Sequence, residues 1–172
     1  AGKSGLLRLL AGDLAPAGGD ATLGGLSLQR DGAAWRRAVA WHDPAASWDG
    51  QLRPRDLFAG LPARFEHFSA EALEDLVDGF GLAPHREKAF FMLSAGTRRK
   101  VLLAASLAAG TALTLIDEPF AALDKSSVVF LRELLADMSG HPRRAWLVAD
   151  YEAPPGVPLA GVIDLDRPAA AG

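Results

Sequence analysis

The sequence predicts an α/β fold with a mostly parallel sheet. Three short apolar segments have the composition of buried parallel strands, at residues 38–41, 112–116 and 145–148. Stretches that favour helices lie between and around them, at residues 53–86, 98–109 and 126–138. Because strands that alternate with helices pair in parallel through helical crossovers, we expect one α/β domain over residues 1–172.

Composition limits the classes of function. With 49% hydrophobic residues among 172, the chain can bury a substantial core. Its net charge of -3 argues against a nucleic-acid partner held by positive charge. The absence of cysteine excludes disulfides and thiolate zinc sites. The longest nearly apolar run, residues 101–116, is shorter than the ~20 residues of a membrane span, so we expect no membrane crossing.

The first residues carry half of a phosphate-binding motif. Gly2-Lys3-Ser4-Gly5 precedes an amphipathic run, as in the second half of the pattern G-x-x-x-x-G-K-[ST]. In that pattern backbone N–H groups at a helix start surround phosphates, the lysine reaches the outer phosphates and the serine hydroxyl binds Mg²⁺. The alternative is an ordinary helix after a loose N-terminus.

The next elements are a hairpin, a strand and a helical region. Residues 22–28 predict a hairpin around two glycines, and the strand at 38–41 ends at His42. Ser69 predicts a helix N-cap, followed by an apolar stripe and a helix end at Gly81. We expect a helical subdomain over about residues 45–99. Its aromatic residues indicate either a surface that grips a partner or the subdomain's own core: Trp48, Phe58, Phe65 and Phe68.

Two acidic residues follow the strand at 112–116. At the carboxyl edge of a parallel sheet, a carboxylate points into the crevice where α/β folds bind ligands. Asp117 there can hold Mg²⁺ through water, and Glu118 can polarise an attacking water. The alternative is a polar exit from the strand, broken by Pro119.

The remaining elements are a helix, two strands and a tail. The helix at 126–138 is expected to turn four apolar residues inward: Val129, Leu131, Leu134 and Leu135. After the strand at 145–148, residues 161–165 predict a further buried strand. Residues 167–172 are expected to be disordered.

Two more motifs produce a family resemblance. Leu93-Ser94-Ala95-Gly96 resembles the signature motif of ATP-binding cassette (ABC) proteins, and residues 121–124 resemble the D-loop of that family. Their order and spacing relative to Lys3, Asp117 and Glu118 match an ABC nucleotide-binding domain over essentially the whole chain. Within the family, residues 41–44 are most similar to the heme-exporter ATPases of cytochrome c maturation.

The resemblance implies a P-loop NTPase (RecA-like) core with a helical subdomain, and ATP and Mg²⁺ as cofactors. Two such domains associate head to tail and trap ATP between the phosphate loop of one and the signature of the other. The implied ATP-binding residues are Gly2, Lys3, Ser4, Gly5, Ser94, Ala95, Gly96 and Asp124. Glu118 is the implied catalytic residue, and the implied metal ligands are Ser4, Asp117 and His42.

The implied partners are a second ATP-binding domain and membrane-spanning permease subunits, with no nucleic acid. The implied location is the cytoplasmic face of the cell membrane. The family also has further strands before this point, so we expect the chain to be N-terminally truncated.

Three departures from the family pattern leave hydrolysis open. Ala149 stands where a switch histidine is expected, His42 where a glutamine is expected, and Gly5 where a hydroxyl residue is usual. The first hypothesis is therefore an ATP-hydrolysing transporter subunit. The second is a degenerate nucleotide-binding module with little or no hydrolysis, paired with another domain.

Overall fold

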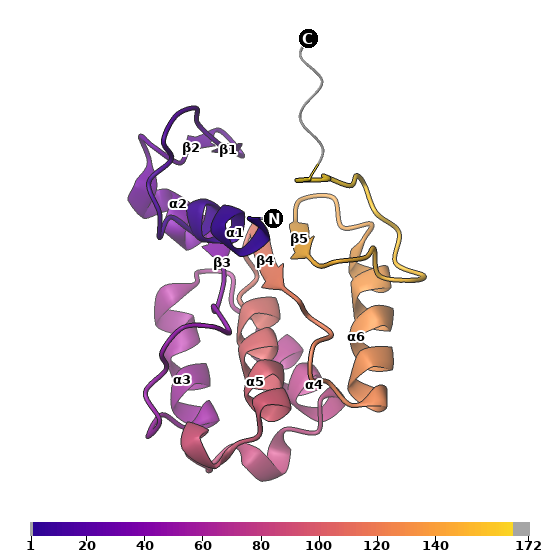
Figure 1. Ribbon diagram of the computed structural model, residues 1–172. Coiled ribbons are helices and arrows are strands. Elements are labelled where there is room, and N and C mark those ends of the chain that lie inside the picture. The colour runs from indigo at the N-terminus through magenta and orange to yellow at the C-terminus, as the bar shows by residue number, and fades with distance from the viewer. Residues whose placement is uncertain (1, 167–172) are drawn as a thin grey trace.

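A parallel sheet lies between two helical layers in the computed structural model, which describes residues 2–166 (Figure 1). Its strands are β3 (Val39–Ala40), β4 (Leu113–Asp117) and β5 (Ala145–Ala149), in the order β3-β4-β5. Both neighbouring pairs are parallel. The predicted α/β class and parallel sheet are confirmed.

One face of the sheet is covered by α1 (Lys3–Ala11) and α2 (Gly32–Ala38). Leu7 and Trp35 from these helices pack with Leu115 and Ala149 from the sheet in one buried cluster. Strands β1 (Thr22–Leu23) and β2 (Leu26–Ser27) pair antiparallel beside this layer, which confirms the predicted hairpin.

The other face carries the larger helical layer (Figure 1). Its helices are α3 (Pro54–Arg64), α4 (Ala70–Gly79), α5 (Ala95–Ala108) and α6 (Lys125–Met138), with short 3-10 turns η1 (Ala83–His85) and η2 (Phe90–Met92). Ser69 caps α4 as predicted, because its Oγ accepts a hydrogen bond from the Ala72 N–H at 3.1 Å. Helix α5 starts three residues earlier than predicted.

The aromatic residues of the helical region belong to the core. Phe58 and Phe65 are 5% and 1% exposed, and Trp48 and Phe68 pack against the same cluster. The prediction that these four residues form a partner surface is therefore wrong, since their side chains belong to this buried cluster or pack against it. The large apolar side chains exposed in this region are instead Phe91 and Met92.

Two predictions near the C-terminal end are wrong. Val129 is exposed, while Leu131 and Leu135 of the same helix are buried. Residues 161–165 form no strand, and Val162 and Ile163 are exposed, because this segment pairs with none of the described strands. The tail at 167–172 lies outside the described residues. No helix within residues 2–166 is long and apolar enough to span a membrane.

Candidate functional site

The start of α1 has the backbone of an anion-binding turn. Gly2 has φ 83°, a left-handed conformation that glycine adopts without steric cost, and Lys3 begins the helix directly after it. The first N–H groups of a helix have no partners within it and attract anions. Ser4 and Gly5, in the same turn, are exposed.

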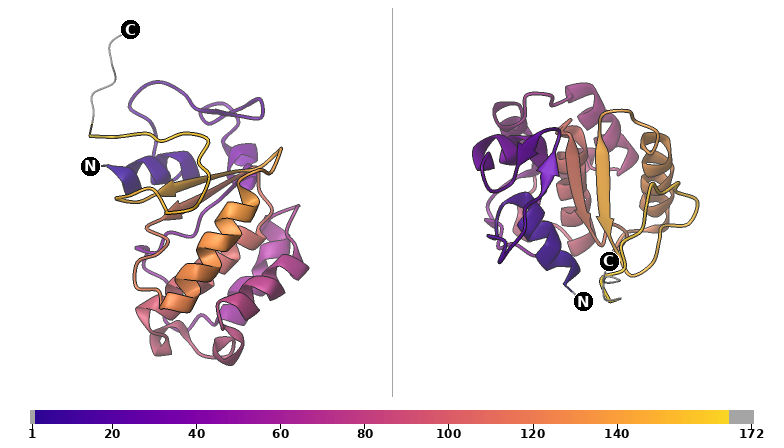
Figure 2. Two further views of the ribbon diagram at one scale, coloured as in Figure 1. Left: turned by 90° about the vertical axis from the view of Figure 1, so that its right-hand side faces the viewer. Right: turned by 90° about the horizontal axis from the view of Figure 1, so that it is seen from above.

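The side chain of Lys3 lies against Tyr151. Its Nζ is 3.8 Å from the centroid of that ring, a cation–π contact between α1 and the chain just after β5. Tyr151 is the single tyrosine of the chain and is otherwise highly exposed. This contact places the end of β5 beside the start of α1, as Figure 2 also shows.

Asp117 ends β4 on the face that α1 covers. Side chains alternate along a strand, and Leu115 packs with Leu7 of α1, so Asp117 shares that face. One oxygen of Asp117, Oδ1, is buried and has no hydrogen-bond partner. A buried carboxylate oxygen without a partner is costly unless a ligand or water satisfies it.

This donor set fits Mg²⁺. The ion prefers oxygen ligands and in nucleotide sites takes one or two protein ligands, with phosphates and waters completing its shell. Ser4 offers an exposed hydroxyl and Asp117 the buried carboxylate oxygen. Among the described residues no cluster of three or more acidic or histidine side chains could hold a metal alone, so the phosphates of a nucleotide would supply the remaining ligands.

His42, the magnesium ligand that the family resemblance implies, is a buried residue of the helical layer. It is 5% exposed, and its Nδ1 lies 2.8 Å from the Ser106 hydroxyl of α5. Its ring stacks on Trp48 and meets the edge of Phe65. His42 is therefore a hydrogen-bonded core residue, since the chain turns its ring into the helical layer directly after β3.

Burial lowers the pKa of His42 to about 4 from an ordinary value near 6.5. The unfolded chain then binds more protons than the folded chain between these values, so stability falls as pH falls from about 6.5 to about 4. We expect His42 to cost about 3 kcal/mol of stability across this window. Urea unfolding at pH 7 and pH 4.5 measures it. His42→Gln should flatten the pH dependence, whereas the same change at the exposed His67 should leave it intact.

The acidic residue next to His42 lies closer to α1. Asp43 accepts hydrogen bonds from Arg8 of α1, at 3.2 Å from Nε and 3.1 Å from Nη2. This ion pair was not predicted from the sequence. The available signal was that a carboxylate at the end of a parallel strand meets the helices at the same edge of the sheet.

Glu118 leaves β4 with an unusual backbone. Its φ is 42°, in the left-handed region that a residue other than glycine seldom adopts. Its N–H donates to the carbonyl of Ala149, at 2.8 Å. The turn that carries the predicted catalytic carboxylate is thus bonded to the end of β5.

Ala149 is a core residue. It pairs with Asp117 in the sheet register and packs with Leu7 and Leu115, at 7% exposure. A histidine side chain at this position would have to enter the core. The two side chains that come directly after β5 are those of Asp150 and Tyr151.

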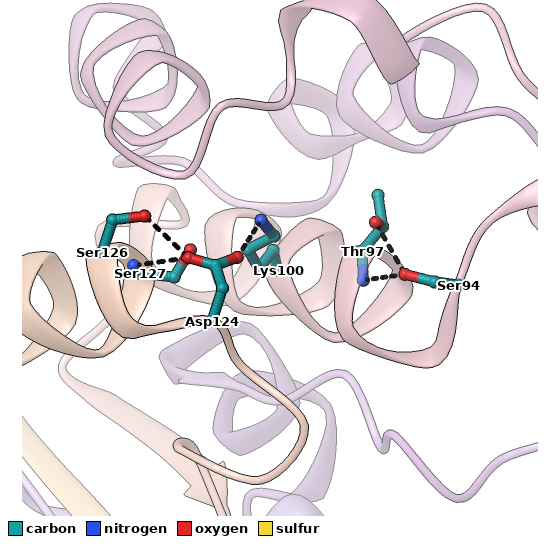
Figure 3. Close-up of polar contacts among 6 residues, drawn as sticks. All are labelled: Ser94, Thr97, Lys100, Asp124, Ser126 and Ser127. Atoms are coloured by element: carbon teal, nitrogen blue, oxygen red, sulfur yellow. Dashed lines mark hydrogen bonds and ion pairs between the residues drawn. The ribbon is translucent and has the colours of Figure 1, made fainter.

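Ser94 and the signature residues begin α5 (Figure 3). The Oγ of Ser94 accepts a hydrogen bond from the Thr97 N–H at 3.1 Å, so Ser94 is the N-cap. Ala95 and Gly96 are the first two residues of the helix, whose N–H groups have no partners within it. This turn lies apart from α1 in Figure 1 and in the left view of Figure 2.

Asp124 caps the neighbouring helix, α6 (Figure 3). Hydrogen bonds from the Ser127 N–H and the Ser126 hydroxyl, and the Lys100 ammonium at 3.0 Å, hold the pKa of Asp124 well below its usual range. Asp124 and the signature turn are therefore linked through Lys100 of α5.

Gly96 packs against the loop before α6. A Cβ on Gly96 would overlap the backbone carbonyl oxygen of Ala122. We expect Gly96→Ala to destabilise the protein by about 1–3 kcal/mol, because the loop has to move. Gly60→Ala is the matched control in α3, where a Cβ meets nothing within 4 Å. It should be neutral or stabilise by about 0.5–1 kcal/mol in thermal unfolding. An equal effect of the two changes would contradict the predicted overlap.

A helix start with a phosphate-loop sequence, set beside an acidic strand end in a parallel α/β sheet, defines a nucleotide-binding domain of the P-loop class. The sequence matches the ABC transporter family over residues 1–121, and the chain belongs to that family.

Relatives and solved structures support this family assignment. The taurine import ATP-binding protein of Pseudomonas putida is 34% identical over 97% of this chain, and the cytochrome c biogenesis ATP-binding export protein of Pseudomonas fluorescens is 35% identical over 86%. The chain spans 63% and 68% of those proteins.

Two solved structures share the fold. The ATP-binding subunit of an ABC transporter aligns with a TM-score of 0.74 at 21% identity, over 86% of this chain and 62% of its own. A dimeric ATP-binding cassette in a post-hydrolysis state, bound to ADP and Pi, aligns with a TM-score of 0.70 at 18% identity, over 88% of this chain and 70% of its own.

Proposed function

We propose that the chain is the ATP-binding part of an ABC transporter, in which ATP binding and hydrolysis drive membrane-spanning partner subunits. The observation that best supports this proposal is that two features lie together at one edge of the sheet. The start of α1, with its left-handed Gly2, lies beside the strand ends, where Asp117 holds a buried oxygen without a partner (Figure 2).

Each residue at this edge has a role in the proposal. The N–H groups at the start of α1 and the Lys3 ammonium bind the phosphates. Ser4 and Asp117 hold Mg²⁺, which neutralises charge on the phosphate oxygens when it is bound. Glu118 orients the attacking water and accepts its proton.

The signature turn is proposed to act on a second ATP-binding domain. Ser94, Ala95 and Gly96 lie apart from α1, so one copy alone does not bring them to the phosphates that α1 binds (Figure 1). A head-to-tail partner, either a second copy or a related domain, would supply its own nucleotide to this turn. The dimeric cassette of the same fold supports such an arrangement.

We propose that the permease subunits bind the helical region at about residues 45–99. We also propose that this region is a separate subdomain. Phe91 and Met92 are 64% and 60% exposed there, and large exposed apolar side chains are typical of partner contacts. The proposed location is the cytoplasmic face of the membrane, where such a complex would meet ATP. The relatives are named for taurine import and for export in cytochrome c biogenesis, so both directions of transport are candidates.

A specific observation favours a second candidate, a nucleotide-binding module with little or no hydrolysis. Ala149 is buried, and the two side chains after it are an aspartate and a tyrosine rather than a histidine. Losing one preorganised contact to the reacting group typically lowers the rate by about 10²–10³-fold.

ATP hydrolysis by the full-length protein, reconstituted with its permease in lipid, separates the two candidates. Turnover that increases when transported substrate is present supports the transporter. ATP binding without turnover supports the second candidate. A protein that neither binds nor hydrolyses ATP overturns both.

A further inference from the structure

The turn after β4 contains two residues in an unfavourable backbone conformation. Glu118 has φ 42° and Ala122 has φ 60°, and neither is glycine. A residue other than glycine persists in this region only where its surroundings hold it there. Contacts with neighbouring groups must therefore hold the backbone of Glu118 in this conformation. The same contacts then set the direction of its carboxylate.

Arg99 of α5 makes the contacts that can do so. Its Nη1 donates to the backbone carbonyl oxygens of Asp117 at 3.0 Å and of Glu118 at 2.7 Å. A guanidinium hydrogen bond to an oxygen is stronger than a neutral one, and Arg99 is partly shielded from water. Together with the bond from the Glu118 N–H to Ala149, these contacts restrain the peptide groups on both sides of Glu118.

We propose that Arg99 is a positioning residue for the catalytic carboxylate. It fixes the left-handed backbone of Glu118 and so directs the side chain toward the water that attacks ATP. This inference rests on the proposed function, in which Glu118 acts on that water.

The same contacts tie Glu118 to the signature turn. Arg99 lies one turn into the helix that Ser94 caps, so a shift of α5 is carried to the carbonyl groups of Asp117 and Glu118. Lys100, its neighbour, instead pairs with Asp124 at the start of α6. Arg99 and Lys100 therefore link α5 to different parts of one loop.

The test compares two substitutions and a control in the full-length protein. Arg99→Met keeps the aliphatic stem and removes the donors. Arg99→Gln introduces a shorter, uncharged polar side chain whose amide nitrogen ends two bonds short of the Nη1 position. Arg98→Met is the matched control, since Arg98 is the exposed neighbour on the same helix. The readouts are kcat and KM for ATP, and hydrogen exchange of the Glu118 amide with nucleotide absent.

We expect Arg99→Met to lower kcat about tenfold or more with KM changed less than twofold, and to speed exchange of the Glu118 amide by a similar factor. Arg99→Gln should show both losses as well, because its amide is too short to reach the two carbonyl oxygens, and Arg98→Met should change neither. If Arg99→Met does not fold, Arg99→Gln decides: a lower kcat with faster exchange of the Glu118 amide supports the inference, and parent values of both overturn it.

Unchanged kcat and exchange in Arg99→Met would overturn the proposal. So would an equal loss of kcat and ATP affinity in Arg99→Met, because that describes a general structural role. If the parent itself does not hydrolyse ATP, the proposed hydrolysis fails, and the exchange measurement still tests whether Arg99 fixes the backbone of Glu118.

Discussion

Glu118→Gln should abolish ATP turnover while leaving ATP binding intact. The amide has nearly the shape of the carboxylate, but it cannot accept a proton from the attacking water. Removing a general base of this kind typically costs 10²–10⁴-fold in rate. Because the backbone of Glu118 is bonded to Ala149 and Arg99, the turn should keep its conformation in the variant. Steady-state phosphate release and an ATP titration measure the two properties.

Glu133→Gln is the control, because Glu133 is an exposed acidic residue on α6. It should leave both properties unchanged. Turnover by Glu118→Gln at the rate of the parent would show that another group activates the water. Asp150, at the end of β5, would then be the first candidate.

Lys3→Ala in the full-length protein should weaken ATP binding by roughly 10- to 150-fold. The expected loss follows from one hydrogen bond between charged groups, worth about 1.5–3 kcal/mol. The substitution also removes the contact between Lys3 and Tyr151, so thermal unfolding of the nucleotide-free protein should be measured alongside.

Lys125→Ala provides a matched control for Lys3→Ala. Lys125 is likewise the first residue of its helix, α6, but it is exposed and follows the cap at Asp124. It should bind ATP like the parent. Equal ATP affinity in Lys3→Ala and the parent would mean that the start of α1 does not hold the phosphates.

Local signals in the sequence were sufficient for much of the fold. Ser69 and the apolar stripe after it predict α4, because a cap and a helical repeat act within a few residues. The acidic pair after an apolar segment likewise predicts the end of β4. Asp117 reaches the edge beside α1 because parallel strands end at one edge of the sheet.

Other features depend on contacts that no local pattern shows. The burial and hydrogen bond of His42 were not predicted because its partner, Ser106, lies on a helix far along the chain. Val129 was expected inside, yet at ~100° per residue it lies about 200° around the helix from Leu131. The apolar residues at 161–165 favour a strand, but a strand forms only where it can pair with the edge of another strand.

The backbone of Glu118 is a further case. The catalytic role of its side chain is a prediction from the sequence. The left-handed turn and the hydrogen bonds from Arg99 were not predicted. An arginine five residues after the N-cap serine is an ordinary residue on the surface of a helix by its local pattern. The carbonyl oxygens that accept its hydrogen bonds come within reach only because α5 packs against β4.

Calorimetric titration of ATP into the full-length protein, with and without Mg²⁺, tests the central claim most directly. If the start of α1 and the Asp117 carboxylate form a magnesium–nucleotide site, ATP should bind at one site per chain, and Mg²⁺ should tighten the binding. No saturable binding, or an affinity that Mg²⁺ does not change, would contradict the site described for this edge of the sheet.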